Sequence, residues 1–386
     1  MLITRIATKQ LKKLAKGFPV VAVVGPRQSG KTTLVQHTFP RMRYISLEDL
    51  DTRSFAENDP RGFLTTYQPP IIFDEIQRSP QLLSYMQGVI DQNKNPGQFI
   101  LTGSQNFLLY QGISQTLAGR VAILHLLPLS LEELSYTQYT SKEYIHYLYQ
   151  GFYPRLYETK LNPRDWYLNY IQTYVERDVR QVKNITDLNA FQRFIAMCAG
   201  NIGQLLNLSS LANDCGITHN TAKSWLSLLE TSFIIFLLKP HYKNFKKRLV
   251  KMPKLYFYDT GLASSLLRIE NSQQLLSHPL KGNLFESLVI SELFKYRLNR
   301  GISTPFYFWR DKVGHEIDCI FETGKKLLPI EIKSGKTITD DYFTNLDYWK
   351  NLTSAQHACM VYGGDEIQKR SDITIFSWRN IPDLLL

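Results

Sequence analysis

One stretch near the start of the chain, residues 20–35, limits what the chain can fold into. It reads VVAVVGPRQSGKTTLV, so an apolar run leads into a loop with the spacing G-x-x-x-x-G-K-T. This spacing is typical of a phosphate-binding loop between a buried parallel strand and a helix. The glycines tolerate unusual backbone angles, so successive N–H groups can point at a polyphosphate, and the following helix adds its positive dipole end. The stretch therefore predicts an α/β nucleotide-binding domain.

The loop residues are the predicted contacts of ATP and Mg²⁺. Lys31 is expected to reach the outer phosphates as a point charge, and the Thr32 hydroxyl is expected to be a ligand of Mg²⁺. The predicted nucleotide-binding residues are Gly25, Pro26, Arg27, Gln28, Ser29, Gly30, Lys31, Thr32 and Thr33, together with Asp74.

Two carboxylates follow a second apolar run, IIFDEIQ, at residues 71–77. A buried central strand would deliver Asp74 and Glu75 to the carboxyl edge of the sheet, beside the phosphate loop. There Asp74 can hold Mg²⁺, and Glu75 can orient or deprotonate the water that attacks the γ-phosphate. Such a pair is also common at strand ends without a catalytic role, but its place downstream of a phosphate loop favours the catalytic interpretation.

Two further residues are candidates for the same site. GQFILTGSQN, residues 97–106, predicts another buried strand, after which Ser104 or Gln105 would face the γ-phosphate or the water; a simple turn is the alternative. Arg120 precedes one more apolar strand. It either completes the site of a neighbouring subunit as an arginine finger or is an ordinary ion-pair residue.

Together, the segments GPRQSGKTTL, IIFDEIQ, ILTGSQN and LAGRV resemble the prokaryotic AAA-family ATPases that carry a C-terminal domain of unknown function. The later segments GFYPRL, YVERDVRQV, YFYDTGL and GNLFESLVISEL are also similar to that family, so the resemblance covers nearly the whole chain. It implies ATP hydrolysis in a homo-oligomer and a polar sensor at Ser104. The family has no single agreed activity beyond this.

The middle of the chain combines a helical segment with a helix-turn-helix pattern. Residues 135–198 are rich in tyrosine and predict a helical lid or linker, to which we assign no function. Residues 209–242 predict a short helix, a turn at Cys215 and Gly216, a second helix carrying HNTAKSW, and a strand, as in a winged helix. This face could contact nucleic acid, or equally could serve protein contacts within an ATPase.

A basic loop follows the predicted winged helix at residues 243–254, and its side chains are candidates for phosphate contacts. Its cations are Lys243, Lys246, Lys247, Arg248, Lys251 and Lys254. The chain as a whole has a net charge of +11, which favours polyanion partners, and we expect DNA more than RNA. No apolar run is long enough for a membrane span, and four widely spaced cysteines fit a reducing cytoplasm.

The last third predicts a second site on three short strands. HEIDCIFE carries Asp318, and LLPIEIKSGK carries Glu331 and Lys333, which share one face because side chains two apart on a strand point the same way. With Glu286 on a preceding helix, this arrangement resembles the D…E-x-K site of restriction-endonuclease-like nucleases. The resemblance implies a divalent metal on Glu286, Asp318 and Glu331, with Lys333 assisting phosphodiester cleavage. A structural ion pair is the alternative.

The predicted architecture has three parts: an AAA-type P-loop ATPase domain at residues 1–140, a helical and winged-helix region at 141–265, and a restriction-endonuclease-like α/β domain at 266–386. Two functions remain open. The chain is either an ATP-dependent enzyme of nucleic acid that also cuts it, or an ATP-driven switch whose last domain is a non-catalytic scaffold.

Overall fold

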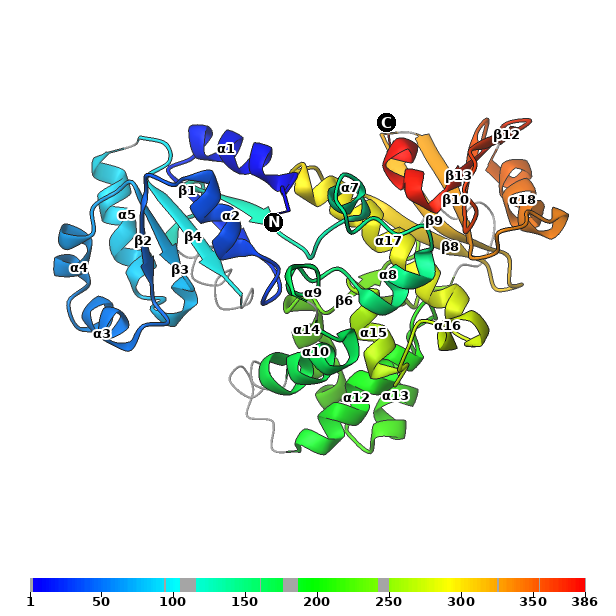
Figure 1. Ribbon diagram of the computed structural model, residues 1–386, viewed down its shortest axis with the longest axis horizontal. Helices are drawn as coiled ribbons and strands as arrows, with labels where there is room; N and C mark the ends of the chain where they lie inside the picture. The colour runs from blue at the N-terminus through cyan, green and yellow to red at the C-terminus, as the bar shows by residue number, and fades with distance from the viewer. Residues whose placement is uncertain are drawn as a thin grey trace.

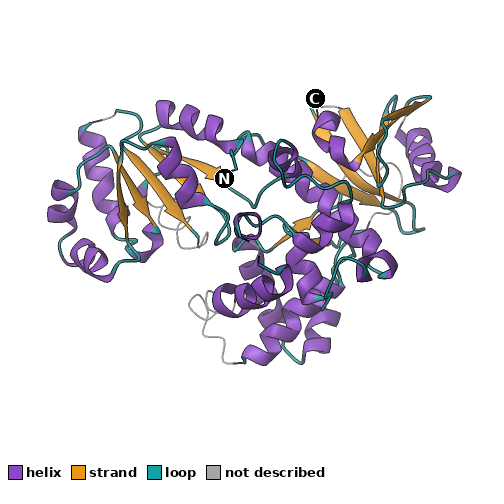
Figure 2. Ribbon diagram, in the orientation of Figure 1, coloured by secondary structure: helices purple, strands orange, loops and turns teal. Residues whose placement is uncertain are grey.

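The computed structural model describes residues 3–93, 95–104, 116–159, 161–175, 187–241, 250–324, 326–353 and 355–385. Figures 1 and 2 show an α/β part at the N-terminal end, a helical middle, and a second α/β part at the C-terminal end. The long helix α17, Lys281–Asn299, lies between the two α/β parts. Within the described ranges, no helix combines the length and apolar character needed to cross a membrane.

The N-terminal part is built on a five-stranded parallel sheet with the order β2-β3-β4-β1-β5. The strands are Val20–Val24 (β1), Arg43–Ser46 (β2), Ile71–Asp74 (β3), Phe99–Gly103 (β4) and Val121–His125 (β5). The helices are Ala7–Gly17 (α1), Lys31–Thr38 (α2), Leu50–Asn58 (α3), Pro60–Thr66 (α4) and Leu82–Gln92 (α5), with the 3₁₀ turn Ile76–Arg78 (η1). All the predicted strands of this domain are confirmed.

The three central strands β3, β4 and β1 are buried on both faces of the sheet, which explains their apolar sequences; the edge strands β2 and β5 are only partly buried. In β1, the alternate residues Val20, Ala22 and Val24 pack towards α4 and α5, whereas Val21 and Val23 pack towards α1 and α2. Because all neighbouring strands are parallel, their carboxyl ends meet at one edge, and the last residues of β1, β3 and β4 are brought together there.

The middle part contains Leu131–Ser135 (α7), Tyr144–Gln150 (α8), Arg155–Glu158 (α9), Pro163–Tyr170 (α10), the π-helical turn Ile171–Val175 (η2), Leu188–Gly200 (α12), Leu208–Cys215 (α13), His219–Thr231 (α14), Ile235–Leu238 (β6), Lys254–Phe257 (β7), Thr260–Leu266 (α15) and Gln274–Ser277 (α16). The predicted helix pair is present as α13 and α14, with Gly216 at a left-handed φ of 68° between them. Strands β6 and β7 pair antiparallel. The elements thus follow the predicted order, and their function as a winged helix stays a prediction.

The C-terminal part is a six-stranded mixed sheet with the order β12-β13-β11-β10-β9-β8. Its elements are Phe306–Arg310 (β8), Glu316–Thr323 (β9), Lys326–Lys333 (β10), Asp340–Phe343 (η3), Thr344–Thr353 (α18), Ala358–Tyr362 (β11), Gln368–Arg370 (β12), Ile373–Ser377 (β13) and Trp378–Leu385 (η4). The three predicted strands are β8 to β10, paired antiparallel. Helix α17 packs on one face of the sheet and α18 on the other.

Candidate active site

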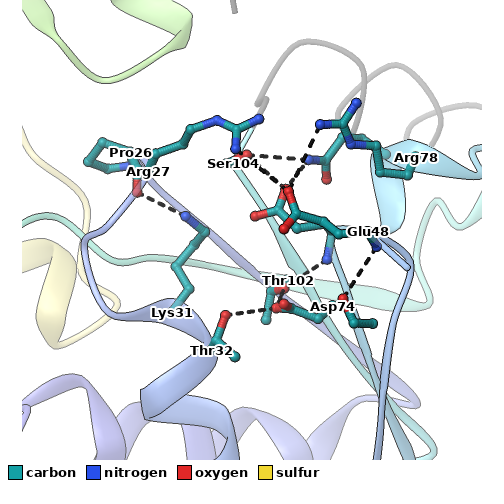
Figure 3. A network of polar contacts seen from close by, with 12 residues as sticks. Pro26, Arg27, Lys31, Thr32, Glu48, Asp74, Arg78, Thr102 and Ser104 are labelled. Atoms are coloured by element: carbon teal, nitrogen blue, oxygen red, sulfur yellow. Dashed lines mark hydrogen bonds and ion pairs between the residues drawn. The ribbon is translucent and has the colours of Figure 1, made fainter. Parts of the chain in front are cut away.

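The loop between β1 and α2 has the shape that its glycines predict. A side chain at Gly25 would place its Cβ 2.0 Å from the carbonyl oxygen of Leu126, and Gly30 has a left-handed φ of 90°. The Lys31 ammonium donates to the carbonyl oxygens of Gly25 (3.1 Å) and Pro26 (2.9 Å), so the loop curls around it (Figure 3). The backbone of the phosphate loop and the Lys31 ammonium therefore lie close together at the start of α2.

Asp74, the last residue of β3, is held by hydroxyl groups from three other elements. Thr32 Oγ1 (2.9 Å) and Thr102 Oγ1 both donate to Asp74 Oδ1 (Figure 3). Tyr44 OH donates to Asp74 Oδ2 (2.8 Å). Burial and the Asp74 carboxylate raise the pKa of Tyr44, which therefore stays a hydrogen-bond donor. The Thr32 hydroxyl and Asp74 carboxylate are hard oxygen ligands side by side, so these residues fit Mg²⁺.

Glu75 follows Asp74 with a left-handed φ of 56°, a conformation that costs a non-glycine residue about 1–3 kcal/mol. Its carboxylate accepts hydrogen bonds from Ser104 Oγ (2.8 Å) and from the Gln77 amide. Burial alone would raise the pKa of Glu75, but the Lys31 ammonium and the Ser104 hydrogen bond outweigh it and lower that pKa. The strained backbone thus presents an ionised carboxylate beside the phosphate loop.

These residues open into a cavity of about 780 Å³ that the P-loop domain and the middle part enclose together. The predicted residues that line it are Arg27, Gln28, Gly30, Lys31, Thr32, Thr33, Asp74 and Glu75. Arg155, Trp166 and Tyr170 form part of the opposite wall, and Tyr170 OH donates to the carbonyl oxygen of Arg27 (3.3 Å). The helical segment to which we assigned no function therefore forms a wall of the site.

Arg120 does not reach the site of its own chain. Arg120 immediately precedes β5, whereas the phosphate loop follows the neighbouring parallel strand β1. Arg120 and the loop therefore lie at opposite ends of these strands. The guanidinium of Arg120 makes two bonds to the Asp91 carboxylate, at 2.8 and 3.1 Å. A role as an arginine finger requires a neighbouring subunit and stays a prediction.

Gln105, the alternative to Ser104, lies outside the described residues.

Comparison with known proteins identifies the family of the chain. Residues 17–135 match the family described as AAA domain, and residues 141–273 and 281–381 match two domains of unknown function, DUF8612 and DUF4143. The uncharacterized protein Rv2008c of Mycobacterium tuberculosis is 30% identical over 338 residues, which cover 86% of this chain and 74% of that protein. The chain belongs to the family of Rv2008c and carries the AAA domain of a P-loop ATPase.

More distant similarities to this AAA-domain ATPase are also found. An uncharacterized protein of Haemophilus influenzae is 24% identical over 246 residues, covering 60% of this chain and 58% of the relative. Among solved structures, the Walker-type ATPase paby2304 of Pyrococcus abyssi aligns with a TM-score of 0.46 and 13% identity, over 68% of this chain and 95% of the other.

The C-terminal part of the ATPase brings the second set of predicted residues close together. Antiparallel pairing of β9 with β10 places Asp318 near Glu331, and the Ile332 amide donates to Asp318 Oδ2 (2.8 Å). Lys333 Nζ donates to Glu331 Oε1 (2.7 Å). Burial and the nearby Asp318 carboxylate raise the pKa of Glu331 to about 8, and Glu331 Oε2 is buried without a partner.

Glu286, on α17, forms an acidic cluster with Asp318 and Glu331. It has a partner that the sequence did not predict. Lys254 Nζ, from β7, lies 2.9 Å from Glu286 Oε1 and also forms an ion pair with Glu316; the Tyr256 hydroxyl donates to Glu286 as well. This corrects the role predicted for Lys254, because a buried ammonium between two carboxylates cannot contact the phosphates of DNA. Of the other predicted cations of that loop, Lys251 is exposed, and residues 242–249 lie outside the described part of the chain.

The carboxylates of the cluster approach from two sides of the sheet. Ile330 and Ile332 pack into the core under α17, so the alternation of β10 turns Glu331 towards α18, whose Asn345 amide lies 3.5 Å from Glu331 Oε1. Glu286 comes from α17 on the other side. Across the described residues, no group of three or more Asp, Glu, His or Cys side chains is arranged to hold a metal ion. Asp318 and Glu331 remain a pair of neighbouring carboxylates, which are donors of the type that suits Mg²⁺ or Mn²⁺.

Proposed function

We propose that the AAA domain hydrolyses ATP with Glu75 as the base that activates the attacking water. The observation that carries this proposal is the Glu75 carboxylate, ionised and held by Ser104 and Gln77 at the edge of the cavity that also contains Lys31. Mg²⁺ held by Thr32 and Asp74 would neutralise charge on the phosphates. Replacing Glu75 by Gln tests the proposal, because the amide keeps the shape of the side chain and loses the base.

We propose that the active form is a homo-oligomer in which Arg120 completes the site of the adjacent subunit. The proposal is supported by the position of Arg120 at the sheet edge away from its own phosphate loop, with its guanidinium paired to the exposed carboxylate of Asp91. An exposed ion pair contributes little to stability, so Arg120 could exchange Asp91 for a phosphate of the neighbouring subunit at small cost.

We propose further that ATP turnover acts on nucleic acid, DNA rather than RNA. The support is the net charge of +11 and the exposed residues His219, Asn220 and Lys223 on α14, the second helix of the pair. Helix pairs of this kind contact DNA through the exposed face of their second helix.

Charge reversal of Lys246, Lys247 and Arg248 to Glu is expected to weaken DNA binding and to flatten its salt dependence. For each phosphate that the variant no longer neutralises, the slope of log affinity against log salt should fall by about 0.9, because fewer counterions are released. Fluorescence anisotropy with a duplex at several salt concentrations measures this slope. The matched control reverses Lys9, Lys12 and Lys13, which are exposed on α1 and change the net charge equally. Equal slopes in the two triple variants would assign the 246–248 cations to solubility.

A second candidate function is metal-dependent cleavage of nucleic acid at the acidic cluster. It is favoured by the approach of Asp318 and Glu331 beside Lys333 and by the partnerless buried oxygen of Glu331. The ion pairs of Lys254 and Lys333 favour the alternative, a non-catalytic scaffold.

If the cluster cuts DNA, Asp318→Ala and Lys333→Ala should each abolish cleavage and leave ATP hydrolysis unchanged, because the cluster lies outside the AAA domain. Supercoiled plasmid and single-stranded DNA, incubated with Mg²⁺ or Mn²⁺ in the presence and absence of ATP, measure cleavage. Lys336→Ala, which removes an exposed lysine from its pair with Glu143, is the control. Absence of cleavage by the unmodified protein in all these reactions would leave the scaffold function.

A further inference from the structure

Arg5, which precedes helix α1, reaches the back of the phosphate loop. Its guanidinium is buried and donates to three acceptors: the carbonyl oxygen of Ser29 (2.6 Å), the carbonyl oxygen of Leu127 (2.7 Å) and Glu133 Oε1 (3.0 Å). Ser29 belongs to the phosphate loop, and Leu127 lies just beyond β5. The Arg5 side chain therefore links the phosphate loop to the segment that follows β5.

The bond to Ser29 fixes the orientation of a peptide group in the loop. A trans peptide is planar, so its carbonyl and its N–H point in opposite directions. Because Arg5 holds the Ser29 carbonyl at the back of the loop, the N–H of Gly30 is directed the other way. Gly30 lines the cavity with Lys31, whereas Ser29 is fully buried and does not line it.

We infer that Arg5 is a positioning residue for phosphate binding, which holds the peptide between Ser29 and Gly30 with its N–H facing the phosphates. This inference rests on the proposed ATP site and adds a residue that the P-loop motif does not contain. We expect Arg5 to affect the binding of ATP more than its hydrolysis. The side-chain hydrogen bonds of Arg5 go to Ser29, Leu127 and Glu133 and not to Glu75, and Arg5 does not line the cavity that contains Glu75.

The positive charge of Arg5 is balanced by the buried carboxylate of Glu133. Glu133 is buried and accepts from Arg5 and from the Ile6 amide (2.8 Å) through Oε1, while its Oε2 accepts from the Ser130 amide (3.1 Å). Ser130 and Glu133 form a capping box at the start of α7, so the acceptor is itself fixed. A guanidinium reaches three acceptors at fixed angles from one plane, whereas an ammonium is a single point donor.

The test compares the unmodified protein with Arg5→Lys, which keeps the charge and removes the planar fork. We expect the KM for ATP and the inhibition constant of inorganic pyrophosphate to rise together, each by roughly 10-fold, because both ligands bind through phosphates and depend on the same oriented N–H. The kcat should change much less, since Glu75 is untouched. The control is Arg164→Lys, which alters an exposed ion pair with Glu270.

A merely structural role for Arg5 would lower the thermal midpoint and the fraction of active protein and leave both constants unchanged, and that result would overturn the inference. If Arg5→Lys does not fold, Glu133→Gln weakens the same clamp and should raise both constants roughly threefold; unchanged constants would then overturn it. Absence of ATP binding by the unmodified protein would refute the proposed function itself, which is a different outcome.

Discussion

Glu75→Gln is expected to lower phosphate release from ATP by roughly 10²–10⁴-fold while ATP stays bound, because a general base contributes a factor of this size. The amide can still accept a hydrogen bond from Ser104, so the shape of the site is kept, but it cannot take a proton from water. Chromatography of the protein after incubation with Mg²⁺ and ATP measures the trapped nucleotide. Recovery of ADP alone would contradict the role of Glu75.

Lys31→Ala is the matched control for this variant. It removes the cation around which the phosphate loop curls, so it should retain no ATP at a concentration that saturates Glu75→Gln. The trapped Glu75→Gln sample also reports on assembly, because an arginine finger needs adjacent subunits. Light scattering that finds only monomer with ATP bound would remove the finger role of Arg120.

Lys254→Met is expected to lower the free energy of unfolding by about 3–5 kcal/mol, because removing one partner of a buried ion pair leaves an uncompensated charge. The Lys254 side chain is 4% exposed and lies against Glu286 and Glu316. Met has nearly the same length, so a change in packing contributes little. Urea unfolding measures the change. Lys336→Met, at an exposed pair with Glu143, is the control and should cost less than about 1 kcal/mol.

The destabilisation of Lys254→Met should shrink as the pH falls. Burial raises the pKa of Glu286 from its ordinary 4.5 to about 7, even with the opposing effect of Lys254. The folded state therefore binds this proton more tightly than the unfolded state, and between those two values its stability falls as the pH rises. Without Lys254 the same carboxylate is more easily protonated, so the variant should be closest to the unmodified protein at low pH. A destabilisation independent of pH would contradict this account of the cluster.

The positions of the phosphate loop and of Asp74 and Glu75 in the fold could be predicted from the sequence, because each follows an apolar run that is typical of a buried strand. The hydroxyl groups that hold Asp74 could not be found in this way. Tyr44 and Thr102 are on β2 and β4, and both reach Asp74 only because the strand order places β3 between them. Strand order is a property of the whole sheet and leaves no mark in a local pattern.

The burial of Lys254 and the residues of the cavity wall also could not be predicted from a local sequence pattern. Lys254 ends a basic run, which predicted a solvent-exposed cation, but it also begins the buried strand β7, and pairing with β6 carries it into the core. Trp166 and Tyr170 have the helical spacing of core aromatics, and they do pack with Tyr153. Their position in the cavity wall depends on how the middle part packs against the phosphate loop.

The approach of Asp318 to Glu331 was predictable, since hairpin pairing follows from the two strands and their short turn. The direction from which Glu286 arrives was not. It depends on the packing of α17 against the face of the sheet opposite α18. The pattern D…E-x-K therefore identified neighbours in space without showing whether they can share an ion.

The most direct test of the central claim is the rate of phosphate release at saturating ATP and Mg²⁺, measured in parallel for the unmodified protein and Glu75→Gln. We predict steady release by the unmodified protein, dependent on Mg²⁺, and release lower by roughly 10²–10⁴-fold in the variant. Equal rates in the two proteins would contradict the assignment of Glu75 as the catalytic base.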